Sequence, residues 1–101
     1  MSKGYWIAHV EVHDQDAWNE YRSLNKIAFR KYGARFLVRG GSREVAEGQA
    51  RSSTVVIEFK DYTTAIACLR SPEYAASIEK RRGKGHVDLV IAEGYDGAQP
   101  G

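Results

Sequence analysis

Four short segments of this chain are rich in β-branched and aromatic residues, and most are apolar at both odd and even positions. They are Tyr5–Val12, Ala34–Val38, Thr54–Phe59 and His86–Ala92. This composition predicts β-strands. The helical sequence available in 101 residues is enough to cover only one face of such a sheet. We therefore expect a second copy of the chain to cover the other face, which makes the protein a homodimer.

The length predicts a single domain, which we place at residues 1–97, followed by a disordered tail at 98–101. The net charge of +2 is too small to indicate a nucleic-acid or anionic membrane partner. The lone Cys68 excludes an internal disulfide, which favours a reducing compartment. The chain shows no signal-peptide pattern and no apolar run approaching the roughly 20 residues that span a bilayer. We expect a cytoplasmic protein that binds neither nucleic acid nor membrane.

Two helical stretches separate the strands. The first is predicted over Gln15–Tyr32, with Asp14 as its N-cap and Gly33 after its last turn. The cations of this helix are expected on its solvent-exposed face, together with Glu20: Arg22, Lys26, Arg30 and Lys31. The second stretch begins after Asp61 and restarts at Ser71, where a serine cap precedes Pro72.

The segment after the second strand is expected to bend or bulge at Gly40-Gly41 and to resume as a strand through Arg43–Ala46. The resulting order is β-α-β-β-α-β, the ferredoxin-like split unit. Right-handed crossovers place both helical segments on one face of a four-stranded antiparallel sheet with strand order 4-1-3-2.

Alternation along the strands assigns their residues to two faces. The uniformly apolar set is expected to face the helices: Trp6, Ala8, Val10, Val12, Phe36, Val38, Val55, Ile57, Phe59, Val87, Leu89 and Ile91. The other set mixes apolar and ionisable groups: Tyr5, Ile7, His9, Glu11, Arg35, Leu37, Arg39, Val56, Glu58, Asp88, Val90 and Ala92. We expect this mixed face to meet the second copy, with its ionisable groups in or beside the covered space.

His9 and Glu58 are the candidate catalytic residues, because imidazole and carboxylate groups transfer protons near neutral pH. They should lie close together if the first and third strands are neighbours. The simpler alternatives are a histidine satisfied by a neighbouring side chain and a carboxylate in a salt bridge that sets the dimer register.

Arg39, Gly40 and Gly41 form a candidate ligand-binding segment, with Tyr5 and Asp88 as further candidates. An arginine fork suits a carboxylate or phosphate, and the glycines allow close approach of a ligand. The alternatives are a bent strand with an exposed or paired arginine, and a tyrosine that packs at the edge of the core.

The spacing of histidine and cysteine residues shows no metal-binding signature. His9 and His13 share one face of a strand but lie about 13 Å apart, too far to hold one zinc ion. We therefore expect neither a metal nor a cofactor.

Five motifs, taken in this order, resemble domain-of-unknown-function family 1330 (DUF1330) over about residues 3–97. They are Tyr5-Trp6-Ile7-Ala8, Phe36-Leu37-Val38-Arg39-Gly40-Gly41, Val56-Ile57-Glu58-Phe59, Ser71-Pro72-Glu73-Tyr74 and Glu93-Gly94-Tyr95. The resemblance implies a dimeric α/β barrel, in which two ferredoxin-like sheets face each other. Its superfamily includes cofactor-independent monooxygenases, lactone isomerases and haem-dependent peroxidases. The family has no established activity, so no catalytic residue is transferred.

These observations favour an enzyme or binding protein for a small, anionic organic molecule. As an enzyme it would use cofactor-independent acid–base chemistry, with Arg39 holding the anionic group. The alternative is a non-catalytic dimeric module whose polar residues fix the pairing of the two copies.

Overall fold

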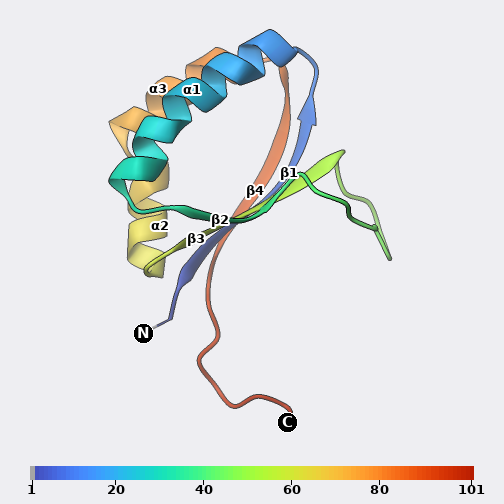
Figure 1. Ribbon diagram of the computed structural model, residues 1–101, viewed down its shortest axis with the longest axis vertical. Coiled ribbons are helices and arrows are strands. Elements are labelled where there is room, and N and C mark those ends of the chain that lie inside the picture. The colour runs from blue at the N-terminus through green and yellow to red at the C-terminus, as the bar shows by residue number, and fades with distance from the viewer. Residues whose placement is uncertain (1) are drawn as a thin grey trace.

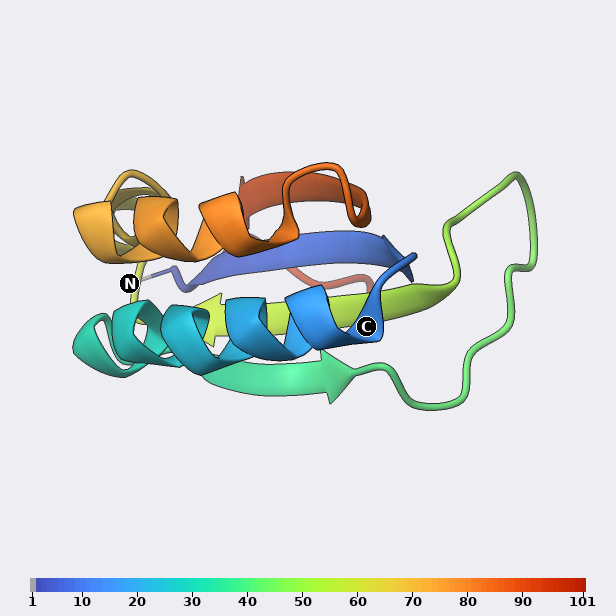
Figure 2. The ribbon, with the colours of Figure 1, turned by 90° about the horizontal axis from the view of Figure 1, so that it is seen from above.

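The computed structural model describes residues 2–101, so the first residue of the predicted domain lies outside the described residues. A curved four-stranded antiparallel sheet carries three helices on one face (Figures 1 and 2). The elements are β1 (Gly4–Val12), α1 (Gln15–Lys31), β2 (Arg35–Arg39), β3 (Ser53–Phe59), α2 (Tyr62–Leu69), α3 (Pro72–Arg81) and β4 (Gly85–Glu93). The strand order β2-β3-β1-β4 is the predicted 4-1-3-2 read in reverse, which confirms the ferredoxin-like fold.

Side-chain caps start the three helices where the sequence predicts them. Asp14, Asp61 and Ser71 each accept a hydrogen bond from the backbone N–H three residues later, at 3.0, 2.7 and 3.1 Å. Ser71 therefore separates α2 from α3. No helix within residues 2–101 has the length and apolar character needed to cross a membrane.

The cap of α2 makes the stability of the protein dependent on pH. Hydrogen bonds with Thr64 hold the pKa of Asp61 below its usual value of 3.8. The folded protein therefore favours the ionised form of Asp61. The stability that this carboxylate contributes is complete above the pKa of Asp61 in the unfolded chain, and it is lost as the pH falls through the lower pKa of Asp61 in the folded protein. Asparagine caps a helix equally well but does not titrate. As the pH falls from about 7 to about 3, we expect the urea midpoint of the wild type to decrease relative to that of Asp61→Asn, because only the wild-type cap loses its charge. A difference that stays constant would contradict this assignment.

Trp6 lies at the centre of the core and is only 3% exposed. Its ring contacts Phe29, Phe59 and Tyr74, with centroid separations of 5.4, 5.4 and 4.9 Å. Its indole N–H donates a hydrogen bond to the carbonyl oxygen of Ala65 at 2.9 Å. One side chain of β1 thus joins α1, α2, α3 and β3.

A bulge in β2 changes the face on which its last residues lie. Phe36 pairs with Ile57 as parity predicts, but the register then shifts, so that Val38 pairs with Val56 and Arg39 with Val55. Arg39 therefore lies on the helix-facing side, and Val38 is 41% exposed on the other side. The predicted faces of these two residues are wrong, because a bulge inserts one residue and reverses the alternation after it.

The predicted strand through Arg43–Ala46 is also wrong, because residues 41–52 contain no strand. The chain leaves the sheet at Gly40, whose φ of 69° is a left-handed conformation and whose N–H donates to the carbonyl oxygen of Thr54 at 2.9 Å. The polar sequence that follows has few apolar side chains to hold it on the sheet. Residues 94–101 form no helix or strand, and disorder of the tail at 98–101 stays a prediction.

The sheet face that carries no helix, called here the open face, exposes large apolar side chains. They are Ile7 (37% exposed), Leu37 (45%), Val38 (41%) and Val90 (61%). They come from the central strand β1 and from the two edge strands, β2 and β4.

Candidate functional site

A cavity of about 100 Å³ lies between α1 and the helix-facing side of the sheet. Its walls are largely apolar and aromatic: Trp6, Trp18, Phe29, Phe36, Val55 and Leu89. A wider opening of about 290 Å³ adjoins it between α1 and β2. The two spaces share Arg22, Asn25, Phe29, Phe36 and Arg39, so we treat them as one site, called here the α1–β2 cavity.

The placement of the helices explains where the cavity opens. In Figure 2, α3 lies over β1 and β4, α1 lies over β3, and β2 lies beyond the outer edge of α1. A buried hydrogen bond joins α1 to α3: the hydroxyl groups of Tyr21 and Tyr74 lie 2.6 Å apart. No further helix within residues 2–101 covers β2, so the space beside α1 reaches the surface there.

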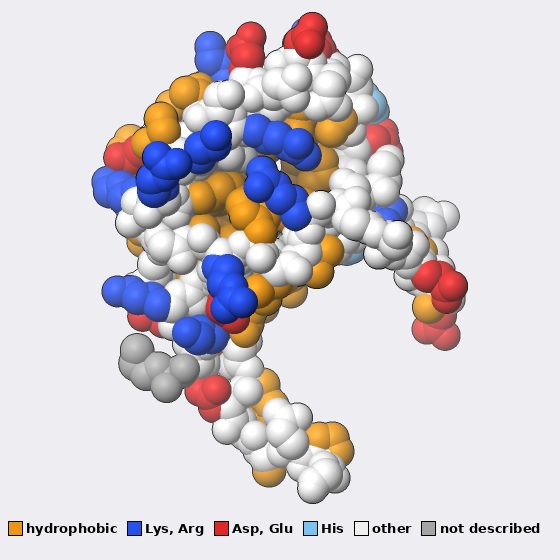
Figure 3. Space-filling view, in the orientation of Figure 1, with side chains coloured by type: hydrophobic (Ala, Val, Ile, Leu, Met, Phe, Trp, Pro, Cys, Tyr) orange, Lys and Arg blue, Asp and Glu red, His pale blue; other side chains and the backbone are white. Residues whose placement is uncertain are grey.

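Four cationic side chains surround the opening. Arg22, Lys26 and Arg30 come from α1, and Arg39 comes from β2. The spacing of four residues aligns the three cations of α1 along one side of the helix. Figure 3 shows Lys and Arg side chains gathered around an opening floored by hydrophobic side chains, over α1 and β2.

The charge of this rim is not balanced by the protein. No Asp or Glu among residues 2–101 lines either space, and none of the four cations forms an ion pair within those residues. The guanidinium of Arg39 instead lies over the ring of Phe36, 4.1 Å from its centroid. The rim can therefore attract an anion without first breaking an ion pair.

Asn25 supplies a buried polar group to the same site. It is 7% exposed and lines both spaces, yet its side chain makes no hydrogen bond to the part of the chain that the structure describes. Its amide atoms are not among the fully enclosed side-chain atoms that lack a hydrogen bond, so they reach the open space of the site. The Asn25 amide is therefore available to a bound molecule or to water.

The inner end of the cavity carries two phenol hydroxyls, and the guanidinium of Arg81 lies over the Tyr21 ring, 4.9 Å from its centroid. Burial raises the pKa of Tyr74 far above its usual value of 10.0, and its hydrogen bond with Tyr21 acts in the same direction. Both phenols line the cavity. The α1–β2 cavity thus combines neutral hydroxyls inside, aromatic walls and a cationic rim.

The candidate site residues predicted from the sequence lie on two different faces of the sheet. Arg39 and Gly40 line the α1–β2 cavity, whereas Gly41 does not. The other four do not line it either, and belong to the open face: Tyr5, His9, Glu58 and Asp88.

The expectation that His9 and Glu58 lie close together is wrong. β1 and β3 are neighbours, but their register places His9 opposite Thr54 and Tyr5 opposite Glu58. Four residues along a strand separate the two by about 13 Å. His9 Nδ1 lies 3.0 Å from Thr54 Oγ1, and the Tyr5 hydroxyl donates to Glu58 Oε2 at 3.2 Å. Desolvation and this bond to Glu58 raise the pKa of Tyr5.

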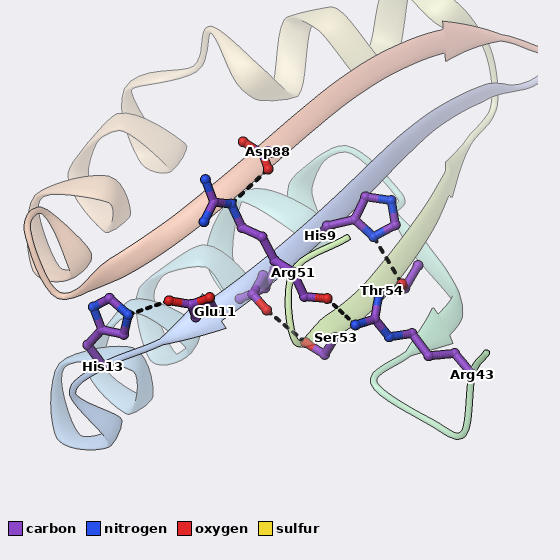
Figure 4. A network of polar contacts seen from close by, with 9 residues as sticks. His9, Glu11, His13, Arg43, Arg51, Ser53, Thr54 and Asp88 are labelled. Carbon is purple, nitrogen blue, oxygen red and sulfur yellow. Dashed lines mark hydrogen bonds and ion pairs between the residues drawn. The ribbon is translucent and has the colours of Figure 1, made fainter. Parts of the chain in front are cut away.

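The loop after β2 returns to the open face, where its arginines make polar contacts (Figure 4). Arg51 Nε donates to Asp88 Oδ2 at 2.7 Å, and Arg43 donates to Thr54 Oγ1 at 3.1 Å. Arg43 also donates to the carbonyl oxygen of Arg51. Asp88 is therefore paired by the loop of its own chain.

Sequence reasoning missed most of the cationic rim by treating the α1 cations as ordinary solvated groups. The signal was present in the spacing of Arg22, Lys26 and Arg30, three cations four residues apart. Asn25 gave no signal, because its position in the wall of both spaces is visible only in three dimensions.

The sequence matches the family described as a domain of unknown function, DUF1330, over residues 3–95. The chain belongs to DUF1330. This confirms the resemblance found in its motifs. No functionally curated protein matches the sequence of this DUF1330 member.

Solved structures of low sequence identity share the fold of this DUF1330 protein. A protein of unknown function from Rhodopseudomonas palustris has a TM-score of 0.72 at 12% identity, covering 95% of this chain and 85% of its own. A protein from Bacteroides fragilis, described as dimeric with a ferredoxin-like fold, has a TM-score of 0.60 at 13% identity, covering 90% and 95%. SnoaB from Streptomyces nogalater, a cofactor-independent oxygenase, has a TM-score of 0.60 at 12% identity, covering 100% of both chains.

Proposed function

We propose that this DUF1330 protein binds a small organic anion with an apolar body in the α1–β2 cavity. The observation that carries the proposal is the set of four cations, without ion pairs within residues 2–101, around a cavity walled by aromatic side chains. The apolar body would occupy the inner space, and the anionic group would lie at the rim.

The chemistry of the rim favours a carboxylate or phosphate. Arginine presents parallel N–H groups that match two oxygens of such an anion, and charge-assisted hydrogen bonds are stronger than neutral ones. Arg22 and Arg39 line both spaces, one from α1 and one from β2, so a single anionic group between them would join the two elements. Asn25 adds a neutral donor and acceptor next to this position.

SnoaB, which shares the fold, is a cofactor-independent oxygenase, and this supports the view that the fold can carry a site for a small molecule. It does not transfer a reaction to this chain, since the likeness concerns the fold. A role in proton transfer for His9 or Glu58 stays a prediction, and it would concern the open face, because neither residue lines the cavity.

Removing the charge of Arg39 should weaken ligand binding. The probes are a panel of aromatic and aliphatic monocarboxylates and the corresponding neutral amides, titrated by isothermal calorimetry. We expect carboxylates to bind and amides to bind at least about tenfold more weakly, because a charged hydrogen bond contributes about 1.5–3 kcal/mol. Arg39→Met should weaken carboxylate binding by a similar factor, and Arg22→Met likewise.

The matched control is Arg70→Met, because Arg70 is an exposed cation that lines neither space and forms no ion pair within residues 2–101. It should leave binding unchanged. Equal affinity for carboxylates and amides would rule the proposal out, and so would equal losses in Arg39→Met and Arg70→Met.

We also propose that two copies pair through the open face. The exposed side chains of Ile7, Leu37, Val38 and Val90 support this, because a two-fold axis lets one apolar surface cover its own copy. The description of the Bacteroides fragilis protein as dimeric supports the same arrangement. In the alternative function, a non-catalytic dimeric module, this pairing would be the whole role of the open face, with Tyr5 and Glu58 fixing its register.

A further inference from the structure

Two of the three histidines of the chain meet a glutamate where β1 ends and β4 begins. Glu11 and His86 are direct cross-strand partners, and His13 follows Glu11 by two residues. The candidate ligand atoms of Glu11, His13 and His86 all lie within 4.8 Å of one another. His13 Nε2 lies 2.6 Å from Glu11 Oε2, and a dashed line in Figure 4 marks this contact. The imidazole rings of His13 and His86 have centroids 5.1 Å apart.

The backbone holds this cluster in place. The N–H groups of His13 and Asp14 both donate to the carbonyl oxygen of Lys84, at 2.9 and 3.2 Å. This carbonyl belongs to the turn just before β4, so the end of β1 and the start of β4 are joined. A Cβ on Gly85 would collide with the Glu11 carbonyl and with the Trp18 ring, which shows how closely the two strands approach here.

An ordinary ion pair accounts for only part of this arrangement. It explains the contact between Glu11 and His13, but the His86 side chain makes no hydrogen bond or ion pair within residues 2–101. Arg51 forms its ion pair with Asp88, at 2.7 Å, and its charge also favours the carboxylate form of Glu11, the form that can bind a metal ion. His86 is therefore free to act as a third ligand beside the other two.

We propose that Glu11, His13 and His86 bind a divalent transition-metal ion of the zinc type, with water in the fourth position. Zinc accepts imidazole nitrogen and carboxylate oxygen at about 2.0–2.2 Å, which places tetrahedral ligand atoms about 3.4 Å apart. The spread of up to 4.8 Å closes to this value through rotation of the side chains, which are exposed or half-exposed. Two imidazole ligands select a transition metal over calcium or magnesium, which prefer oxygen ligands.

The site is independent of the α1–β2 cavity. None of its residues lines either space of the cavity. Loss of metal binding would leave the anion-binding proposal intact, and the reverse also holds.

The experiment uses the full chain without a histidine tag and the zinc ion alone. Zinc is titrated in competition with a chromogenic chelator, and cobalt is added separately to record the visible absorption of a four-coordinate site. We expect one zinc ion per chain, and at least about tenfold weaker binding in His86→Ala and Glu11→Gln. The cobalt band should disappear in His86→Ala.

The matched control is His9→Ala, which removes the third histidine from the same strand face but outside the cluster. It should bind zinc as the wild type does. Cys68 cannot supply a competing site at the surface, because its side chain is 0% exposed and burial raises the pKa of its thiol to about 12. Zinc binding that is absent in the wild type, or that His86→Ala leaves unchanged, would overturn the proposal. An equal loss in His9→Ala would overturn it as well.

Discussion

Replacing Trp6 with alanine is expected to lower the free energy of unfolding by about 3–5 kcal/mol. The side chain is 3% exposed and fills the space between three other aromatic rings, so its removal leaves a cavity that the sheet and helices cannot close without moving. It also removes the hydrogen bond that the indole N–H donates to the carbonyl oxygen of Ala65. Urea unfolding followed by circular dichroism measures the change.

One further variant separates the packing of the ring from the hydrogen bond of the indole, and another serves as a control. Trp6→Phe keeps an aromatic ring but loses the indole N–H, so it should destabilise the protein less than alanine does. Tyr95→Ala removes an aromatic ring that is 70% exposed, and it should change the stability by no more than about 0.5 kcal/mol. A loss in Trp6→Ala no larger than that in Tyr95→Ala would show that Trp6 is not the centre of the core.

Val90→Asp is expected to convert the proposed dimer into monomers at micromolar concentration. Val90 is the most exposed of the large apolar residues of the open face, at 61%, and lies opposite Ile7 in the sheet. In a two-fold dimer each copy carries the new carboxylate into the interface, and one unpaired buried charge costs about 3–5 kcal/mol. The dimer dissociation constant should therefore rise by at least about 100-fold. Sedimentation velocity measures the change in mass.

The control is Ile27→Asp, which places the carboxylate at an apolar residue that is 56% exposed on α1, on the opposite side of the sheet. It should leave the dimer intact, and both variants should keep the circular dichroism of the wild type. A wild type that sediments as a monomer would exclude pairing through this face, as would a Val90→Asp variant that remains dimeric.

The helices and their starting points were predictable because their signals are local. Asp14, Asp61 and Ser71 cap helices through atoms only three residues away, and the order of the elements then restricts the sheet to one common topology. The apolar core was predictable for a similar reason, since strand alternation alone places Trp6 and Ile57 on the helix-facing side, where both are buried.

The candidate site was less predictable, because one residue of shift in a strand reverses which face its side chains occupy. The bulge in β2 carries Arg39 from the open face to the cavity, and the sequence around Gly40-Gly41 indicates an irregularity without showing that it begins before Val38. The cationic rim also depends on where α1 lies relative to β2, which no helical pattern reveals.

The sequence by itself determined the four strands of the sheet, the helix caps, the order of the elements and the presence of two unequal sheet faces, since each depends on residues near one another in the chain. The tertiary structure alone decided the register. It separates His9 from Glu58, brings Arg39 to the α1 cations and joins Glu11 and His13 to His86. The physical reason is that register follows from hydrogen bonds and packing between segments distant in the sequence, whose alternatives differ by a single residue.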